Sequence, residues 1–149
     1  MNLKRIFLLS IPVIILLFIG WFYFAISGLS YDYSPSFEKV KFTNSENSDS
    51  VFIKKKVWGI SANSQVIIIS RNGEVPFSPD STSDFIFSAW SSFLYKFEND
   101  TLTTYAPIAF QIPENFDSEI TIEQKVLTSP EMINLVNTYK EKELILFNR

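Results

Sequence analysis

The clearest structural signal in the chain is the stretch FLYKFENDTLTTY, residues 93–105. Two runs rich in aromatic residues and threonine, which favour strands, flank the polar triplet Glu98-Asn99-Asp100. A short polar turn between two such runs is typical of a β-hairpin. The stretch therefore predicts two antiparallel strands, and it indicates a body built mainly from β-sheet.

More strand-like segments lie on both sides of this hairpin. The run Val66-Ile67-Ile68-Ile69 has no polar residue, and because side chains alternate between the faces of a strand, it predicts a central strand covered on both sides. Asn72-Gly73 predicts a turn with positive φ. The strands expected outside the hairpin are 37–43, 51–58, 66–69, 85–87, 110–112, 120–127 and 144–147, with turns or loops at 44–50, 61–65, 71–74, 75–83 and 91–92.

One amphipathic helix is expected near the end of the chain. Ser129 is a suitable N-cap, and Pro130 fits the first helical position, where no backbone N–H is needed. An apolar stripe at helical spacing follows, which would pack on a sheet: Met132, Leu135, Val136 and Tyr139. Residues 37–149 are therefore predicted to form a mainly β (α+β) domain, a small antiparallel β-sheet or sandwich of seven or eight strands with one C-terminal amphipathic helix.

A different kind of segment precedes this domain. The run Ile6 to Ile26 carries no charge and follows Lys4 and Arg5. At about 1.5 Å per residue, a helix of this length crosses a hydrocarbon core of roughly 30 Å. Residues 1–27 are therefore predicted to be a signal-anchor or transmembrane helix that contacts the lipid bilayer, and the Ser- and Tyr-rich residues 28–36 are predicted to be a tether.

The flanking charges predict the orientation of this segment. Basic residues stay on the cytoplasmic side, so Lys4 and Arg5 place the N-terminus in the cytoplasm and the β-domain outside it, in a single-pass protein. An alternative is a secretory signal, because Ala25-Ile26-Ser27 has the small-x-small pattern of a cleavage site near Ser27. Both interpretations export the β-domain.

Composition argues against several classes of function. Without residues 1–27 the chain keeps 11 of its 13 basic residues against 16 acidic ones, a net charge of −5, which argues against a nucleic-acid partner. The chain has no cysteine and no histidine. It therefore lacks thiolate metal sites, the usual zinc ligand and a Ser-His-Asp triad. We expect no cofactor and no enzymatic activity.

The run Lys54-Lys55-Lys56, in a strand-like segment, is the first candidate binding site. Consecutive lysines offer a basic patch for an anionic partner, such as lipid headgroups or an acidic wall polymer. They also protect an edge strand against pairing with another molecule, and the pattern favours this structural role. Trp58 and Trp90 are further candidates, as a stacking platform for sugar or peptide, although aromatic residues lie more often in a core.

Acidic residues suggest two further kinds of site. The stretch DSTSD, residues 80–84, places oxygen ligands at alternating positions, as calcium loops do. It lacks the glycine and the distal glutamate of an EF-hand loop, so Asp80 and Asp84 are weak candidates and no metal is expected. Together with Glu98 and Asp100 they also suggest a carboxylate pair for glycoside hydrolysis, but such pairs arise by chance in a small acidic domain.

These observations predict a membrane-anchored extracytoplasmic β-domain that acts as a binding or structural module in the cell envelope, with an envelope protein among its candidate partners. The alternative is a secreted carbohydrate- or peptide-binding protein, released by signal cleavage near Ser27. The first residue of the mature protein distinguishes the two, because a chain beginning at Gly28 indicates secretion.

Overall fold

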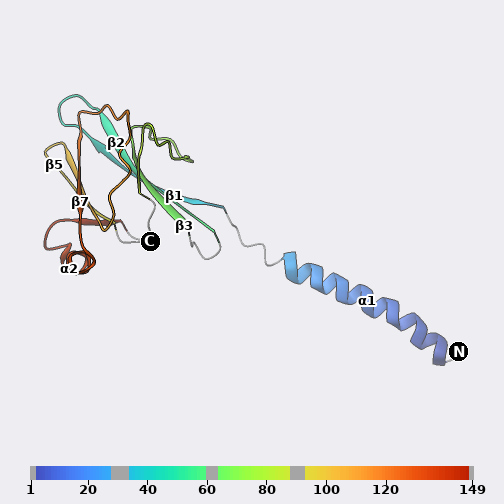
Figure 1. Ribbon diagram of the computed structural model, residues 1–149. Helices are drawn as coiled ribbons and strands as arrows, with labels where there is room; N and C mark the ends of the chain where they lie inside the picture. Colours follow the sequence, from blue (N-terminus) through green and yellow to red (C-terminus); the bar gives the residue numbers. More distant parts are fainter. Residues whose placement is uncertain (1–2, 28–33, 60–63, 88–92, 148–149) are drawn as a thin grey trace. The chain divides into compact units, whose positions relative to one another are not determined.

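The computed structural model describes residues 3–27, 34–59, 64–87 and 93–147, and within the first of these ranges the side chains of residues 11–25 (Figure 1). The chain divides into two compact units, residues 1–33 and residues 34–149. The predicted tether, residues 28–36, lies largely outside the described residues. Its last residue, Ser36, already belongs to the first strand.

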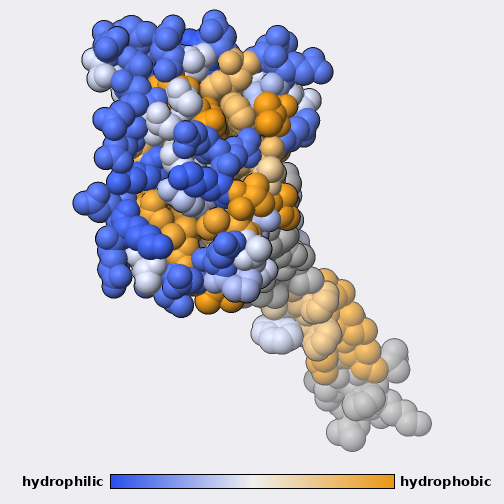
Figure 2. Space-filling model, turned by 60° about the vertical axis from the view of Figure 1, so that its left-hand side comes forward, coloured by the Kyte–Doolittle hydropathy of each residue, from blue (hydrophilic) through white to orange (hydrophobic). Residues whose placement is uncertain are grey.

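The first unit contains one helix, α1 (Leu3–Ser27), with Pro12 inside it. The large apolar side chains from Ile11 to Phe24 are 45–79% exposed, and the described part of the helix presents a mostly hydrophobic surface (Figure 2). Among the described residues, no helix combines the length and the apolar character needed to cross a membrane. The membrane-spanning role of Ile6 to Ile26 stays a prediction.

The second unit is mainly β, as predicted, with eight strands among its described residues. Their bounds are β1 Ser36–Thr43, β2 Ser50–Trp58, β3 Ser64–Ser70, β4 Phe85–Phe87, β5 Phe93–Glu98, β6 Thr101–Ala106, β7 Thr121–Val126 and β8 Ile145–Phe147. They form two four-stranded sheets, in the orders β1-β2-β3-β4 and β7-β6-β5-β8. Below, these are the first sheet and the second sheet.

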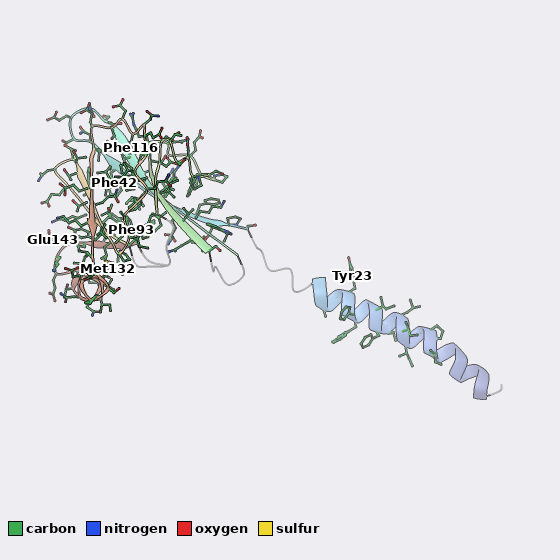
Figure 3. All side chains as sticks on the ribbon, viewed as in Figure 1. Tyr23, Phe42, Phe93, Phe116, Met132 and Glu143 are labelled. Atoms are coloured by element: carbon green, nitrogen blue, oxygen red, sulfur yellow. The ribbon has the colours of Figure 1, made fainter. Side chains whose placement is uncertain are left out.

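The two sheets share one core, so the domain is a sandwich. Val51 and Ile53 of β2 are fully buried, and they belong to the same cluster as Phe93 of β5 and Leu102 of β6. Phe42 of β1 packs edge-on against Tyr95 of β5, with ring centroids 5.5 Å apart. Figure 3 shows Phe42 and Phe93 within the body of the domain. Of the two architectures predicted from the sequence, a single sheet or a sandwich, the aromatic packing between the sheets shows the sandwich.

The run 66–69 is buried on both faces, as its β-branched sequence predicts. Ile67 and Ile69 pack in the core between the sheets, whereas Val66 and Ile68 pack on the opposite face with Phe77. β3 lies between β2 and β4, so the run forms a central strand. The loop between β3 and β4, which carries Phe77, therefore covers part of the outer face of the first sheet.

The helix α2 (Ser129–Thr138) covers the outer face of the second sheet (Figure 1). Met132 and Leu135 pack with Leu94 of β5, which confirms the predicted apolar stripe. The helix begins one residue earlier than predicted, because Thr128 is the N-cap. The Glu131 carboxylate accepts hydrogen bonds from the backbone N and the hydroxyl of Thr128, both at 2.7 Å. Thr128 and Glu131 thus stand at the N-cap and N3 positions of a capping box.

The predicted hairpin is formed by β5 and β6, which are antiparallel. Glu98 pairs with Thr101, so Asn99 and Asp100 alone make the turn. Their φ values are 49° and 54°, the left-handed conformation that a two-residue turn requires and that asparagine and aspartate tolerate. The Asp100 carboxylate also accepts two hydrogen bonds from Ser45, at 2.9 Å and 2.7 Å, and so joins this turn to the β1–β2 loop.

Three sequence predictions about the sheets are wrong. The domain is not entirely antiparallel, because β6 and β7 are parallel. Residues 107–120 carry the chain back from the end of β6 to the start of β7, which a parallel neighbour requires. Within 110–112 the only pairing is an isolated bridge between Ile86 and Gln111, so this segment is part of that crossover and not a strand.

The third error concerns the turn after β3. Among the described glycines, Gly59 has a positive φ and Gly73 does not. The turn is closed instead by the Asn72 side chain, whose carbonyl accepts a hydrogen bond from the Glu74 backbone N at 2.8 Å. Gly73 is needed for space, because a Cβ there would lie 2.7 Å from the Phe52 ring. The turns predicted at 61–65 and 91–92 lie mostly or wholly outside the described residues.

Candidate functional site

Lysines and aromatic residues gather on the outer face of the first sheet. The register pairs Lys41 with Phe52, Lys39 with Lys54 and Phe37 with Lys56, so these side chains share one face of β1 and β2. It is the face opposite Val51 and Ile53, which belong to the core. Trp58 follows on the same face of β2 by alternation. We call this set the basic face: Phe37, Lys39, Lys41, Phe52, Lys54, Lys56 and Trp58.

The ammonium groups of three basic-face lysines, Lys39, Lys54 and Lys56, lie over aromatic rings. Lys39 Nζ is 5.6 Å from the centroid of the Phe52 ring, and Lys56 Nζ is 5.4 Å from that of Trp58 and 6.0 Å from that of Phe37. Lys39 Nζ also donates to the Gly73 carbonyl at 2.8 Å. These cation–π and carbonyl contacts do not neutralise the positive charge of Lys39 and Lys56.

Lysines on the basic face differ in this respect from Lys96 of the second sheet. Among the described residues, no carboxylate lies within 4.0 Å of the Nζ atom of Lys39, Lys41 or Lys56. Lys96 of β5, in contrast, contacts the carboxylates of Glu98 at 3.0 Å and Glu143 at 3.3 Å. The basic face therefore carries positive charge that close ion pairs do not offset.

The three consecutive lysines have three different surroundings. Lys55 points to the inner face, where its ammonium contacts the Glu38 carboxylate at 2.8 Å and lies 4.8 Å from the centroid of the Phe147 ring. Lys54 and Lys55 are each only 2% exposed. The interpretation of the run as protection of an edge strand is wrong, because β2 lies between β1 and β3. A binding role for the run stays a prediction.

Beside Lys54 the first sheet borders a pocket of about 460 Å³. Burial removes water from the Lys54 ammonium and lowers the pKa of this group below its ordinary value of 10.5, while the negative charges of Asp84 and Glu74 oppose the shift. Its Nζ lies 4.8 Å from the centroid of the Phe77 ring and makes one long hydrogen bond, 3.5 Å, to the Glu74 carbonyl. The lining residues include Lys54, Arg71, Glu74, Phe77, Asp80 and Asp84.

The pocket brings together three residues that the sequence singled out separately, Lys54, Asp80 and Asp84. The Asp80 carboxylate accepts hydrogen bonds from the backbone N and hydroxyl of Thr82, at 3.0 Å and 2.8 Å, and from the Ser83 hydroxyl at 3.0 Å. These contacts, those from Thr82 first, hold the pKa of Asp80 below its usual value. The oxygens of Asp80 thus close their own loop and are not arranged around a cation.

Metal and carboxylate-pair chemistry gain no support from the described residues. The described residues contain no group of three or more acidic side chains placed to hold a metal ion. Glu98 and Asp100 lie in the β5–β6 hairpin, where Glu98 binds Lys96 and Asp100 binds Ser45. Asp80 and Asp84 line the pocket beside the other sheet. The four acids proposed from the sequence therefore do not converge on one site.

The two tryptophan candidates have different outcomes. Trp58 ends β2, is 38% exposed and contacts the Lys56 ammonium, so it belongs to the surface and not to the core. Trp90 lies outside the described residues. Sequence reasoning missed Lys39 and Lys41 as site residues. The signal that was available is the alternation of Phe37, Lys39 and Lys41 in a strand whose other face carries Val40 and Phe42.

The chain matches no described protein family, and comparison with curated proteins and with solved structures finds no similar protein.

Proposed function

We propose that the protein is a membrane-anchored binding module, whose β-domain holds a negatively charged partner on the basic face. One observation carries the proposal: Lys39, Lys41 and Lys56 share one face of two neighbouring strands, and no described carboxylate lies within 4.0 Å of them. Since like charges repel, a protein tolerates such a cluster at a cost in stability. An anionic partner removes that cost.

The anchoring part of this proposal rests on the sequence. The uncharged run Ile6 to Ile26 follows Lys4 and Arg5, and this charge pattern favours a cytoplasmic N-terminus and a β-domain in the cell envelope. A protease-protection assay with a reporter fused after Arg149 tests this location. Digestion of the reporter from the outside of intact cells supports it, and full protection of the reporter contradicts it.

Binding is favoured over catalysis by the side chains that the domain offers. The chain has neither histidine nor cysteine, which removes the commonest general base and thiolate nucleophile. Lys54 has a lowered pKa, but the nearby Asp80 carboxylate is engaged by Thr82 and Ser83. We therefore assign no catalytic role to the pocket.

The pocket beside Lys54 favours a second function, the binding of a small polar ligand by a secreted form of the protein. Its polar lining combines donors on Lys54 and Arg71 with acceptors on Glu74 and Asp84, which suits the hydroxyl groups of a carbohydrate or the ends of a peptide. Mass spectrometry of the mature N-terminus separates this candidate from the anchored module, because only the secreted form begins at Gly28.

Retention on a sulfonate cation exchanger at pH 7 tests the anionic-partner proposal. The whole chain has a net charge of −3, so retention of the detergent-solubilised protein requires clustered positive charge. We expect the wild type to bind and the triple variant Lys39→Gln, Lys41→Gln, Lys56→Gln to elute at clearly lower salt. A K4Q/R5Q variant measures the contribution of the N-terminal charges.

The matched control for this experiment is the triple variant Lys96→Gln, Lys125→Gln, Lys142→Gln, which removes the same charge from residues around a pocket of the second sheet. We expect it to elute with the wild type. Equal elution of both triple variants would show that total charge, and not the basic face, controls retention.

A further inference from the structure

We propose that the partner of the basic face is the surface of an anionic lipid bilayer, on which the outer face of β1 and β2 lies. This inference rests on the proposed function, because it names the class of anionic partner that the basic face binds.

The charge of the basic face suits a negatively charged membrane. A lysine close to an anionic bilayer is attracted to the surface potential of the headgroups, and Lys39, Lys41 and Lys56 add three such attractions on one face. This attraction acts within about 10 Å at 0.1 M salt. This range suits a tethered domain, because the tether already holds the domain near the surface.

The kind of cation distinguishes a bilayer from a partner with fixed geometry. The accessible cations of the basic face, Lys39, Lys41 and Lys56, are all lysines, and Lys54 is buried. Arginine forks recognise individual carboxylates and phosphates in fixed pairs, whereas lysine acts as a point charge on a flexible stem. A diffuse layer of lipid headgroups requires the second kind of contact.

Aromatic rings between the lysines supply the other half of an interfacial surface. Trp58 is 38% exposed, and Phe37 and Phe52 are partly buried. Tryptophan rings favour the level of the headgroups, and lysine stems lie along apolar surface while their ammonium groups reach water or phosphate. The contact between Lys56 and Trp58 therefore places a cation beside an amphipathic ring.

The topology places the strongest part of this surface where the chain enters the domain. Ser36, the first residue of β1, pairs with Val57 of β2. Phe37, Lys56 and Trp58 therefore lie at the end of the first sheet that follows the N-terminal segment in the sequence. The Glu38 carboxylate at this end contacts the Lys55 ammonium at 2.8 Å, whereas Glu74, Asp80 and Asp84 line the pocket beside Lys54.

Site-specific fluorescence on the full chain in lipid nanodiscs tests the inference. The chain has no cysteine, so Thr43→Cys gives one label site for an environment-sensitive dye. Thr43 is exposed at the end of β1 far from its start, and alternation places it on the same face as Lys41. A change at this position reports contact along the whole strand and not only next to the tether.

We compare discs of neutral phosphatidylcholine with discs that contain about 30% phosphatidylglycerol, which gives a negative surface potential. In the anionic discs we expect the dye at position 43 to shift to the blue and to gain intensity at least about two-fold, and we expect this difference to disappear at about 1 M salt, where the Debye length is 3 Å. A dye at Thr103→Cys, on the second sheet, should give equal spectra in both discs.

The charge variants make the result specific. The K39Q/K41Q/K56Q variant should lose the difference between the discs, and the K96Q/K125Q/K142Q variant should keep it. Circular dichroism and thermal unfolding show whether both variants keep the fold. If either unfolds, lysine-by-lysine replacement should reduce the spectral difference in steps, and a series of single variants without any reduction overturns the inference.

The remaining outcomes separate the two proposals. Equal spectra in neutral and anionic discs overturn the bilayer inference, and if the wild type is nevertheless retained on the cation exchanger, the anionic partner is a protein or a polymer. If the chain does not incorporate into discs, the anchor proposal fails. The bilayer inference is then decided by flotation of the full chain with vesicles of the same two compositions, and absence of selective flotation overturns it.

Discussion

Lys54 and Lys55 are neighbours in β2, yet their ammonium groups lie on opposite faces of the sheet. Lys55 contacts the Glu38 carboxylate at 2.8 Å, whereas the Lys54 ammonium donates a long hydrogen bond, 3.5 Å, to the Glu74 carbonyl beside a pocket. Both side chains are 2% exposed. Burying an ammonium costs free energy, and at Lys54 the effect of desolvation on the pKa exceeds the opposing attraction of Asp84 and Glu74.

Replacing Lys54 by methionine tests this cost. We expect Lys54→Met to raise the free energy of unfolding at pH 7 by about 1 kcal/mol, because an apolar side chain of similar length needs no desolvation of charge. Since burial lowers the pKa of Lys54 in the folded state, the wild type gains stability as the pH rises from that lowered value towards 10.5. The advantage of the variant should therefore shrink over the same range.

Thermal and denaturant unfolding at several pH values, followed by near-UV circular dichroism, measure this difference. A variant that is less stable than the wild type at pH 7 would mean that attraction to Asp84 and Glu74 outweighs desolvation. Lys41→Met, at an exposed position of the same face, is the control, and we expect a change below about 0.5 kcal/mol.

Gly73 is a second residue at which the surroundings predict the effect of a substitution on stability. A Cβ at this position would lie 2.7 Å and 2.9 Å from two carbons of the Phe52 ring. We expect Gly73→Ala to destabilise the β-domain by about 1–3 kcal/mol, because the ring must move and the contact of Lys39 with it is disturbed. Gly20→Ala, where no atom lies within 4 Å of the added carbon, should leave unfolding of the β-domain unchanged.

At the scale of elements, local signals predicted what local residues determine. The hairpin, the run 66–69 and the stripe of Met132 and Leu135 each carry their pattern within a few residues, and the structure confirms them. The parallel pairing of β6 with β7 was not predictable in this way, because nothing in residues 120–127 specifies a partner strand. Burial of Lys54 and Lys55 also depends on distant rings, those of Phe77 and Phe147.

The same distinction explains the candidate site. Lys54, Asp80 and Asp84 were recognised by residue type, but the pocket that joins them requires the loop 75–84 to fold against β2 and β3. Lys39 and Lys41 became site residues only through the register of β1 with β2. Spacing along one strand was visible in the sequence, whereas the pairing that doubles the number of lysines was not.

The β5–β6 turn gives a prediction about an element. Asn99 has a φ of 49°, which a β-branched residue adopts at a cost of about 1–2 kcal/mol. We expect Asn99→Val to lower the free energy of unfolding by about that amount, and we expect Asn99→Gly to remain within about 0.5 kcal/mol of the wild type. Urea unfolding of the two variants measures the difference. Equal destabilisation by both would instead indicate that the Asn99 side chain itself stabilises the turn.

At the scale of the β-domain, Asp49 connects the two sheets through their loops. It lies between β1 and β2, and its carboxylate contacts Arg71 Nη2 at 2.9 Å on one side. On the other side it accepts hydrogen bonds from the Ser118 hydroxyl at 2.8 Å and the Glu119 backbone N at 3.0 Å, in the crossover to β7. The Ser118 contact comes first among those that lower the pKa of Asp49 below 3.8.

Asp49→Asn should destabilise the β-domain by about 1–2 kcal/mol at pH 7, because the amide presents N–H groups to one set of these donors. A carboxyl whose folded pKa is lowered stabilises above its unfolded pKa of 3.8, and this contribution is lost as the pH falls through the folded value. The gap between wild type and variant should therefore close below pH 3.8. Glu114→Gln, an exposed change in the same crossover, is the control, and a gap that persists in acid would contradict the assignment.

Strand pairings that close late in the chain have a consequence for how the domain assembles. β1 to β4 pair in sequence order. In contrast, β5 pairs with β8 near the end of the chain, and β6 pairs with β7 only after residues 107–120 have returned the chain to the start of β6. Pairing of strands that are far apart in the sequence slows folding, because the entropy of loop closure is lost before the stabilising contacts form. We therefore expect the unpaired edges of β5 and β6 to be the places where partly folded chains associate during biosynthesis. We expect chaperones to bind mainly in the period between the synthesis of β5 and the synthesis of β8.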